Sequence, residues 1–346
     1  MNQSMKTVVL KSYARGKPRA SDFELREATV PVPGERQLLL KTLWLALDPL
    51  YRFAIDEVRI TGALHLQPGD VMAGGTVGEV VVSHHPDYAV GDIVEARTGW
   101  SEYAVVSPDQ TDYRGLPRAV DRSLAPISTA LGALGMPGQT AHASVIGIGR
   151  VQAGETVVIS AAAGAVGSIA GQIAKVLGAH VVGIAGGPQK GRALLDLGFD
   201  CAVDYRAADY AQQLNTSCPK GIDVYVDNVG GAVTLGALPL LKYGARMPVC
   251  GFLAYYGVGM EGPGPDHLPG FLRTIMGRGL EVRGFGGFMV GGNQALKDIA
   301  GWMKEGKISF PESIVEGLAS APEAFASVFA VNAHVGKLLV KVADTN

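Results

Sequence analysis

The hydrophobic period changes twice between Thr156 and Ala185, and this change constrains the fold of the chain more than any other feature. Thr156–Ser160 is a short β-branched run of the kind that forms a buried parallel strand. From Val166 to Leu177 the apolar residues recur at helical spacing, and Gly178 supplies a stop for that helix. His180–Ala185 is a second strand-like apolar run. Strand, turn, helix and strand within about 30 residues predict one βαβ crossover unit.

The turn of this unit is rich in small residues. The chain as a whole has 47 glycines in 346 residues, about twice the ordinary frequency. The turn reads Ala162-Ala163-Gly164-Ala165-Val166-Gly167, which is the GxGxxG dinucleotide-binding pattern with Ala162 in place of its first glycine. Gly164 lets the backbone approach a pyrophosphate, Gly167 lets the helix pack on the strand, and the helix N-terminus holds the anion. The alternative is a tight strand–helix turn that binds no ligand.

Composition disfavours several other classes of protein. The 18 uncharged residues from Val157 to Ala174 are mostly Ala, Gly and Ser and lack the Leu and Phe of a membrane-spanning helix. A formal net charge of −2 offers no basic surface for nucleic acid. The apolar run Val8–Leu10 is shorter than a signal-peptide core, and three scattered cysteines without a CxxC pair suit a reducing compartment. We therefore expect a cytoplasmic protein that binds neither nucleic acid nor membranes.

The length of the chain predicts two domains, because single cores usually stop growing at about 250–300 residues. After Ala185 short apolar runs alternate with helical patterns, which predicts a mostly parallel, doubly wound α/β sheet. Before about residue 125, strand patterns are broken by Pro and Gly, which predicts an all-β unit. We expect the last strand pattern, Gly336–Val342, to return to that unit. The other expected strands are Thr7–Leu10, Phe23–Val30, Leu38–Leu47, Thr76–Ser83, Asp92–Arg97, Cys201–Val203, Val224–Val226, Met247–Cys250 and Leu280–Val282, and the expected helices include Ala193–Leu197 and Ala232–Leu241.

The end of the second strand of the βαβ unit bears on the choice of cofactor. In NAD-binding proteins an acidic residue about 20 positions after the start of the fingerprint binds the adenosine ribose hydroxyls. This chain has no Asp or Glu from Ile184 until Asp196, and it places Lys190 and Arg192 in that segment. NADP(H) is therefore preferred over NAD(H), with the cations available to its 2′-phosphate. The alternative makes both cations solvated residues at the start of a surface helix.

A zinc-dependent alcohol dehydrogenase needs thiolate and imidazole ligands. No cysteine precedes Cys201, and His84-His85 lies beside Pro86 in an expected solvated turn, so zinc is disfavoured. A hydrogen-bond donor then has to stabilise the oxyanion that develops during hydride transfer. Tyr255-Tyr256 follows the predicted strand end at Cys250-Gly251, on the sheet edge where such folds bind ligands. These tyrosines are candidate donors, and ordinary half-buried aromatic residues are the equal alternative.

Motifs along nearly the whole chain carry a family resemblance. They are Ser21–Leu25, Asp48-Pro49, Leu131-Gly132, Gly135–Gly138, Thr140-Ala141, Ala161–Ser168, Gly171–Lys175, Leu197–Asp200, Asp227–Gly231 and Gly336-Lys337. On these residues the chain resembles the zinc-independent branch of the medium-chain dehydrogenase/reductase superfamily that contains prostaglandin, curcumin and 2-alkenal reductases. Cys218–Asp223 and Pro248–Gly251 are most similar to the bacterial curcumin reductases.

The resemblance implies a Rossmann-type doubly wound domain, residues 128–309, inserted into a GroES-like β-barrel domain formed by residues 1–127 and 310–346. It implies a homodimer and NADPH-dependent reduction of the carbon–carbon double bond of small α,β-unsaturated ketones or aldehydes, by hydride transfer to the β-carbon. Enones, 2-alkenals and curcumin-like or prostaglandin-like molecules are the expected substrates. A zinc-independent NADPH quinone reductase and a catalytically silent NADP-binding sensor or structural dimer remain as alternatives.

The resemblance also implies the residues of the site. Tyr256 aligns with the active-site tyrosine of the family, and Lys190 aligns with its 2′-phosphate lysine. The other implied cofactor-binding residues are Gly164, Ala165, Val166, Gly167, Tyr205, Asn228, Cys250, Gly251, Phe252, Leu253, Ala254, Tyr255, Phe285, Gly286 and Gly287. The last three lie in Gly284–Asn293, a candidate mobile loop.

Three residues depart from the family pattern. Leu50 separates Asp48-Pro49 from Tyr51, where many members have Tyr directly after Pro. His142 stands where Tyr is common, and His334 stands where Asn usually precedes the Gly-Lys motif. These positions bear on substrate preference and cofactor affinity rather than on the reaction class.

Overall fold

The computed structural model describes residues 3–59, 64–112, 116–256, 265–286, 292–330 and 334–345. Contacts between residues divide the chain into two compact units. Unit 1 comprises residues 1–131, 312–333 and 338–346, and unit 2 comprises residues 132–311 and 334–337. In chain order, unit 2 therefore interrupts unit 1. The domain boundaries after residues 127 and 309 stay a prediction. Residues 334–337 were expected in the β-barrel domain, but their contacts place them in unit 2.

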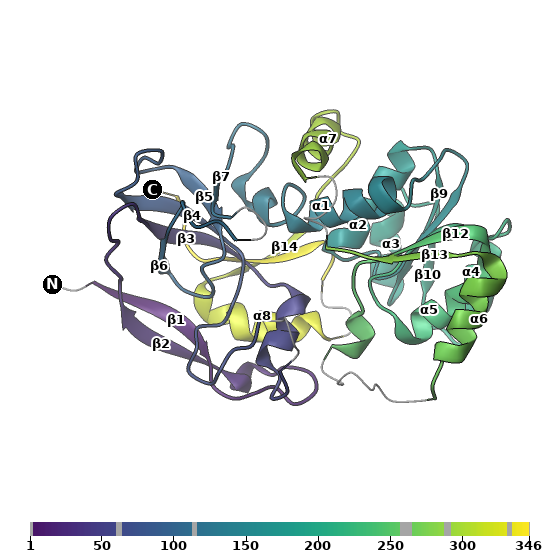
Figure 1. The fold of residues 1–346 in the computed structure, drawn as a ribbon, viewed down its shortest axis with the longest axis horizontal. Coiled ribbons are helices and arrows are strands. Elements are labelled where there is room, and N and C mark those ends of the chain that lie inside the picture. The colour runs from purple at the N-terminus through teal and green to yellow at the C-terminus, as the bar shows by residue number, and fades with distance from the viewer. Residues whose placement is uncertain are drawn as a thin grey trace. The chain divides into compact units, whose positions relative to one another are not determined.

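Unit 2 is built on a six-stranded parallel sheet with the strand order β10-β9-β8-β11-β12-β13 (Figure 1). The strand order reverses between β8 and β11, which is the switch point beside which doubly wound sheets bind ligands. This topology confirms the predicted doubly wound sheet. The strands are β8 (Thr156–Ile159), β9 (His180–Ala185), β10 (Cys201–Asp204), β11 (Ile222–Val226), β12 (Leu241–Val249) and β13 (Glu281–Gly284).

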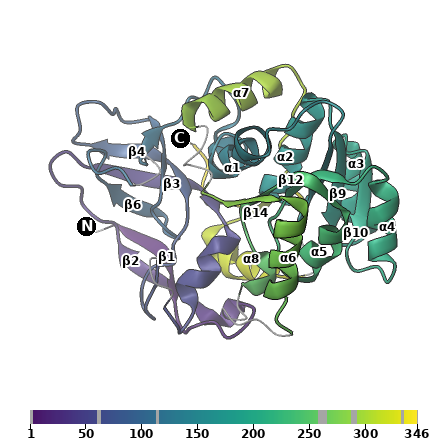
Figure 2. The ribbon, with the colours of Figure 1, turned by 45° about the vertical axis from the view of Figure 1, so that its right-hand side comes forward.

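Helices cover both faces of this sheet. Figures 1 and 2 show α2 on one face and α5 and α6 on the other. The side chains of β8 alternate accordingly, because Val158 belongs to the core beneath α4 and α5, whereas Val157 and Ile159 point to the opposite face. None of the described helices has the length and apolar content to span a membrane. The helices of unit 2 are α1 (Met136–His142), α2 (Ala165–Val176), α3 (Pro188–Asp196), α4 (Tyr210–Ser217), α5 (Gly231–Ala237), α6 (Leu268–Arg278) and α7 (Gly292–Lys304).

Unit 1 contains a two-stranded sheet, β1-β2, and a seven-stranded sheet in which β14-β15-β3-β4-β5-β7 are neighbours and β6 also pairs with β3. Its core holds the rings of Phe23, Trp100 and Phe325, whose centroids lie 5.4 to 5.9 Å apart. The predicted C-terminal strand is confirmed, since β15 pairs with β3. The elements are β1 (Ser4–Leu10), β2 (Phe23–Thr29), β3 (Leu38–Ala46), β4 (Thr76–Ser83), β5 (Ile93–Ala96), β6 (Tyr103–Val106), β7 (Arg118–Ala119), β14 (Glu312–Glu316), α8 (Ala321–Val328) and β15 (Lys337–Lys341).

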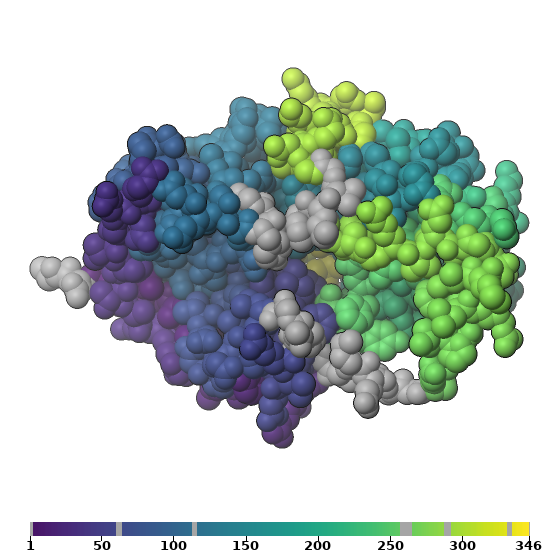
Figure 3. All heavy atoms as spheres, viewed as in Figure 1, coloured from purple at the N-terminus to yellow at the C-terminus, as the bar shows by residue number. Residues whose placement is uncertain are grey.

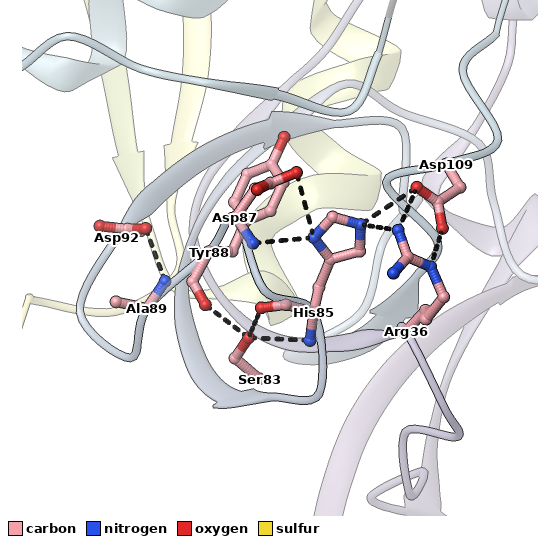
Figure 4. Close-up of polar contacts among 8 residues, drawn as sticks. All are labelled: Arg36, Ser83, His85, Asp87, Tyr88, Ala89, Asp92 and Asp109. Atoms are coloured by element: carbon pink, nitrogen blue, oxygen red, sulfur yellow. Dashed lines mark hydrogen bonds and ion pairs between the residues drawn. The ribbon is translucent and has the colours of Figure 1, made fainter.

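The turn after β4 corrects one sequence prediction. His85 is buried rather than solvated, and it forms the centre of a polar network (Figure 4). Its Nε2 lies 3.1 Å from Asp109 Oδ1, and the backbone N–H of Asp87 donates to its Nδ1 at 3.2 Å. Arg36 binds Asp109 through Nε and Nη2 at 2.6 and 3.0 Å. This network ties the turn to two neighbouring loops, which is a structural role.

The sequence patterns miss several short elements. β6, β7 and β14 have two to five residues each, too few for a clear period of two. β12 begins at Leu241, not at Met247, because Lys242-Tyr243-Gly244 interrupts the apolar pattern. Helix α8 is also missed, because its run of small residues carries little helical signal.

Candidate functional site

The turn between β8 and α2 is narrow enough to require glycine. A Cβ at Gly167 would lie 2.6 Å from both Ala161 O and Ala162 Cα, so no side chain fits there. Gly164 is the N-cap of α2, and Ala165 and Val166 are its first residues. Ala162, which replaces the first fingerprint glycine, is fully buried. The backbone at the N-terminus of α2 therefore has no side chain in the way at Gly164, as in turns that bind a pyrophosphate.

A segment from the far end of the chain lies beside this turn. Gly336 N donates to Ala163 O at 2.8 Å, and Gly336 forms a parallel bridge with Gly164. Gly336 has φ +73°, and a Cβ there would collide with Pro311 O. These constraints explain why residues 334–337 group with unit 2. His334, two residues before Gly336, lies close enough to Lys190 for their charges to interact.

Three basic side chains gather near the ends of β9 and β10. A Cβ on Gly186 would lie 2.9 Å from Tyr205 Cε1 and 3.1 Å from Arg206 Nε, so these two side chains cover Gly186. Burial, and then the nearby Arg206 guanidinium, lower the pKa of Lys190. Burial, and then the Lys190 ammonium, lower the pKa of His334. The lowered pKa leaves His334 mostly neutral at pH 7, and the Lys190 and Arg206 cations together attract a phosphate.

The negative charge around this cluster is small. Arg206 Nε forms an ion pair with Asp204 Oδ1 at 3.3 Å. Lys190 forms no ion pair among the residues that the structure describes. Arg192, the second cation expected from the sequence, is exposed on α3. Sequence reasoning missed Arg206, although its place directly after β10 and Tyr205 is a usable signal.

The end of β11 is held by a buried carboxyl group. Asp227 Oδ1 accepts hydrogen bonds from Ser160 Oγ at 3.0 Å and from the backbone N–H groups of Val229 and Gly230 at 3.0 and 2.9 Å. Its Oδ2 accepts one from Thr234 Oγ1 at 2.7 Å. Asp227 thus fixes the loop that carries Asn228, a role that the sequence patterns do not reveal.

The segment after β12 packs against that loop. Leu253 N donates to Asn228 O at 3.1 Å, and Ala254 N donates to Val229 O at 2.9 Å. The ring of Tyr255 lies over Gly230, with Cε2 3.2 Å from a Cβ placed there. The structure therefore brings Asn228 and the predicted run from Cys250 to Tyr256 together at the carboxyl edge of the sheet.

Tyr256 is the last described residue of this segment. Its ring lies edge-on to Phe252, with 5.8 Å between the ring centroids. Burial, and then the neighbouring Cys250, raise the pKa of Tyr256 to about 12. Its hydroxyl is therefore neutral at physiological pH and retains a hydrogen to donate.

The remaining expected positions are less informative. Phe285 and Gly286 follow β13, whose last residue Gly284 pairs with Val249 at the end of β12. Gly287 lies outside the described residues, as does part of the expected loop Gly284–Asn293. His142 is buried in unit 2, where its Nε2 lies 2.8 Å from Asp298 Oδ2 on α7.

In unit 1, the departure at Leu50 has a clear structural result. Leu50 is 40% exposed, and Tyr51, one position later, is 3% exposed in the core. The tyrosine that follows the Asp-Pro motif is therefore a core residue in this chain.

Comparisons with known proteins identify the family of the chain. Residues 6–113 match the N-terminal domain of oxidoreductase, and residues 165–304 match the zinc-binding dehydrogenase family. The chain is 42% identical to the NADPH-dependent curcumin reductase of Escherichia coli over 97% of this chain and 96% of that one. It is 37% identical to prostaglandin reductase 1 of Rattus norvegicus over 97% and 98% of the two chains.

The chain belongs to the medium-chain dehydrogenase/reductases, in the zinc-independent branch of the prostaglandin, curcumin and 2-alkenal reductases. A solved member is CurA from Vibrio vulnificus in complex with NADPH, with 36% identity, a TM-score of 0.91, and coverage of 98% of this chain and 99% of that one. One matching family model carries zinc in its description, but no group of three metal-ligating side chains occurs in the described part of the chain.

Proposed function

We propose that this chain is an NADPH-dependent reductase of the carbon–carbon double bond of α,β-unsaturated ketones and aldehydes. The observation that carries the proposal is that unit 2 holds a glycine turn, a basic cluster and a neutral tyrosine. The family to which the chain belongs contains NADPH-dependent reductases. The acid that would bind free ribose hydroxyls is missing from the end of β9.

The residues present fit NADP(H). Gly164, Ala165, Val166 and Gly167 hold the pyrophosphate at the N-terminus of α2. A Cβ at Gly167 would collide with the backbone of Ala161 and Ala162 and disrupt this turn. Lys190 and Tyr205 bind the 2′-phosphate, and Arg206 adds a second cation to the same place. Asn228, the run from Cys250 to Tyr256, and Phe285, Gly286 and Gly287 bind the nicotinamide half.

Tyr256 is the proposed catalytic residue. When bound, NADPH supplies a hydride for the β-carbon of the enone. The Tyr256 hydroxyl donates a hydrogen bond to the carbonyl oxygen, which becomes an enolate oxygen as negative charge develops there. Because its pKa is raised to about 12, Tyr256 still carries its proton when this bond forms. The α-carbon is then protonated by water or by the same tyrosine.

A panel of electron acceptors tests this function. NADPH oxidation is followed with 2-alkenals, longer enones, curcumin-like dienones and quinones at equal concentration. We expect kcat/KM to be highest with one of the α,β-unsaturated carbonyl compounds, and NADPH to be preferred over NADH. Higher turnover of quinones would instead identify a quinone reductase, and NADPH binding without turnover of any acceptor would identify a silent binding protein.

The exposed edge of unit 2 supports a homodimer. β13 pairs with β12 on one side, and all its residues are exposed, as are Leu268, Leu272 and Met276 on α6. Figure 3 shows this green surface. Two copies of β13 paired antiparallel about Val282 would set Glu281 of each copy opposite Arg283 of the other, a self-complementary contact.

Light scattering after gel filtration tests the dimer. We expect the parent to have the mass of two chains and Met276→Glu to have the mass of one. Val32→Glu, on an equally exposed apolar residue of unit 1, is the matched control and should remain a dimer. A monomeric parent would contradict the proposal.

We also place the protein in the cytoplasm. Its cysteines Cys201, Cys218 and Cys250 are all free thiols, which supports a reducing compartment. Fractionation of cells that express the tagged chain tests this placement, and recovery in an oxidising compartment would contradict it.

A further inference from the structure

The side chains of Cys250 and Asn228 touch at the ends of β12 and β11. Cys250 Sγ lies 2.9 Å from Asn228 Oδ1, and Asn228 Nδ2 donates to Ser160 O at 2.7 Å. Flipping the carboxamide would bring its oxygen against Ser160 O, so the amide orientation is fixed by chemistry. Oδ1 therefore faces the thiol, and the contact is favourable only if the thiol donates its hydrogen.

The other neighbours of the thiol do not compete for that hydrogen. Asp227 O lies 3.4 Å from Sγ, but it already accepts from the backbone N–H groups of Cys250 and Gly251 at 2.9 and 3.2 Å. Ser144 Oγ lies 3.9 Å from Sγ and donates its hydrogen to a helix carbonyl at 2.7 Å. Asn228 Oδ1 is thus the nearest acceptor with capacity to spare.

The thiol also retains its hydrogen under working conditions. Burial raises the pKa of Cys250 to about 12, so the S–H form dominates at neutral pH. Thiolates, rather than thiols, react with electrophiles such as enones. A protonated Cys250 can therefore persist beside substrates of the proposed class.

We propose that Cys250 is a positioning residue whose S–H hydrogen bond to Oδ1 fixes the Asn228 carboxamide for the bound cofactor. Ser160 O holds one hydrogen of Asn228 Nδ2, and the other has no acceptor among the described residues. The fixed carboxamide offers that hydrogen to the ligand. This inference rests on the proposed NADPH-dependent function.

Two variants of Cys250 separate the effect of its hydrogen-bond donor from the effect of its side-chain volume. Cys250→Ala removes the donor, and Cys250→Ser keeps one. We expect Cys250→Ala to raise the Kd of NADPH, measured by protein fluorescence, by about two- to ten-fold, the usual range for one neutral hydrogen bond. Cys250→Ser should stay within about two-fold of the parent. Equal Kd values for Cys250→Ala and the parent, or equal weakening by Ser and Ala, would overturn the inference.

A double variant tests whether Cys250 acts through Asn228. In an Asn228→Ala background, Cys250→Ala should cause no further rise in the Kd of NADPH. A further rise equal to that in the parent background would show that the thiol acts by another route. Thermal unfolding of each variant verifies that it is folded.

A measurement on the free protein separates this inference from the proposed function. The side-chain ¹⁵N amide signals of Asn228, assigned by their loss in Asn228→Ala, should shift in Cys250→Ala and return towards the parent position in Cys250→Ser. Unchanged signals would overturn the inference whether or not the protein binds NADPH. Shifted signals in a parent that does not bind NADPH would support the contact and contradict the proposed function.

Discussion

Two adjacent tyrosines at the end of β12 have different surroundings. The Tyr255 ring lies against Gly230 and Gly231, where its Oη is 3.8 Å from a Cβ placed on Gly231. Tyr256 lies edge-on to Phe252, and burial raises its pKa to about 12. The residue pattern left a donor role and an ordinary half-buried aromatic role equally open for both tyrosines, and only the family resemblance singled out Tyr256. In the structure, Tyr255 packs on the turn that precedes α5.

Replacing Tyr256 should therefore affect chemistry more than binding. We expect Tyr256→Phe to lower kcat for enone reduction by about 10² to 10³, the usual cost of losing one oxyanion donor. The Kd of NADPH should change little. Tyr243→Phe, at an exposed tyrosine of β12 outside the site, is the control and should retain the activity of the parent. A Tyr256→Phe variant as active as the parent would refute the assigned role.

The basic side chains around Lys190 were only partly predictable from the sequence. Lys190 and Arg192 were predicted because an acid is missing from the end of β9, whereas the structure places Arg192 exposed on α3 and Arg206 beside Gly186. Arg206 is 16 positions from Lys190 along the chain. Its proximity depends on the parallel pairing of β9 and β10, which a local pattern does not show.

Charge removal tests this cluster. We expect Lys190→Ala, and to a similar extent Arg206→Ala, to raise the Kd of NADPH by about 10- to 150-fold, since a charge-assisted hydrogen bond contributes about 1.5–3 kcal/mol. The Kd of NADH should hardly change, because NADH lacks the 2′-phosphate. Arg192→Ala is the control. Equal effects on NADPH and NADH would exclude the 2′-phosphate as the ligand of these residues.

The network in Figure 4 predicts a pH-dependent contribution to stability. Hydrogen bonds from Arg36 and then His85 hold the pKa of Asp109 well below its ordinary value. A carboxyl group whose folded pKa is depressed stabilises the fold above its unfolded pKa of about 3.9, and this stabilisation is lost as the pH falls towards the folded pKa.

Thermal unfolding of Asp109→Asn measures that contribution. The Tm of the parent should exceed that of Asp109→Asn at pH 7, and the difference should shrink as the pH is lowered below about 4. A difference that grows on acidification would have the opposite sign and would contradict the network. Asp121→Asn, whose carboxyl group accepts hydrogen bonds from Ser123, is the comparison.

At the scale of elements, the βαβ unit was the most predictable part of the fold. Buried β-branched runs and a helical stripe specify β8, α2 and β9 locally, and the structure reproduces them to within about one residue. The run from Cys250 to Tyr256 has no periodicity. Its place after a predicted strand end indicated Tyr255 and Tyr256, and only the family resemblance indicated the rest of the run. The anchoring role of Asp227 requires the neighbouring strand end and was not visible in the sequence.

A single added methyl group tests how tightly the β8–α2 turn is packed. Gly167→Ala should lower stability by about 1–3 kcal/mol, because the new Cβ would lie 2.6 Å from the backbone of Ala161 and Ala162. It should also weaken NADPH binding. Gly301→Ala, in α7 with open space around the new Cβ, is the control and should raise stability by about 0.5–1 kcal/mol. Equal Tm changes in the two variants would contradict the tight turn.

At the scale of the whole molecule, chain length predicted two domains but not their connection. Only the resemblance indicated that one domain interrupts the other, and residues 334–337 still grouped with the unexpected unit. The cause is local, since Gly336 N donates to Ala163 O and a Cβ on Gly336 would strike Pro311. A contact between residues that are 173 positions apart leaves no trace in hydrophobic periodicity.

We propose that this protein transfers a hydride from NADPH to the β-carbon of an enone. Mass spectrometry and NMR of the product formed with NADPH deuterated at the transferable hydrogen test this transfer directly. We expect a saturated ketone or aldehyde with one deuterium at the β-carbon and an intact carbonyl group. An unsaturated alcohol with deuterium at the carbonyl carbon, or no deuterated product from any α,β-unsaturated carbonyl compound, would contradict it.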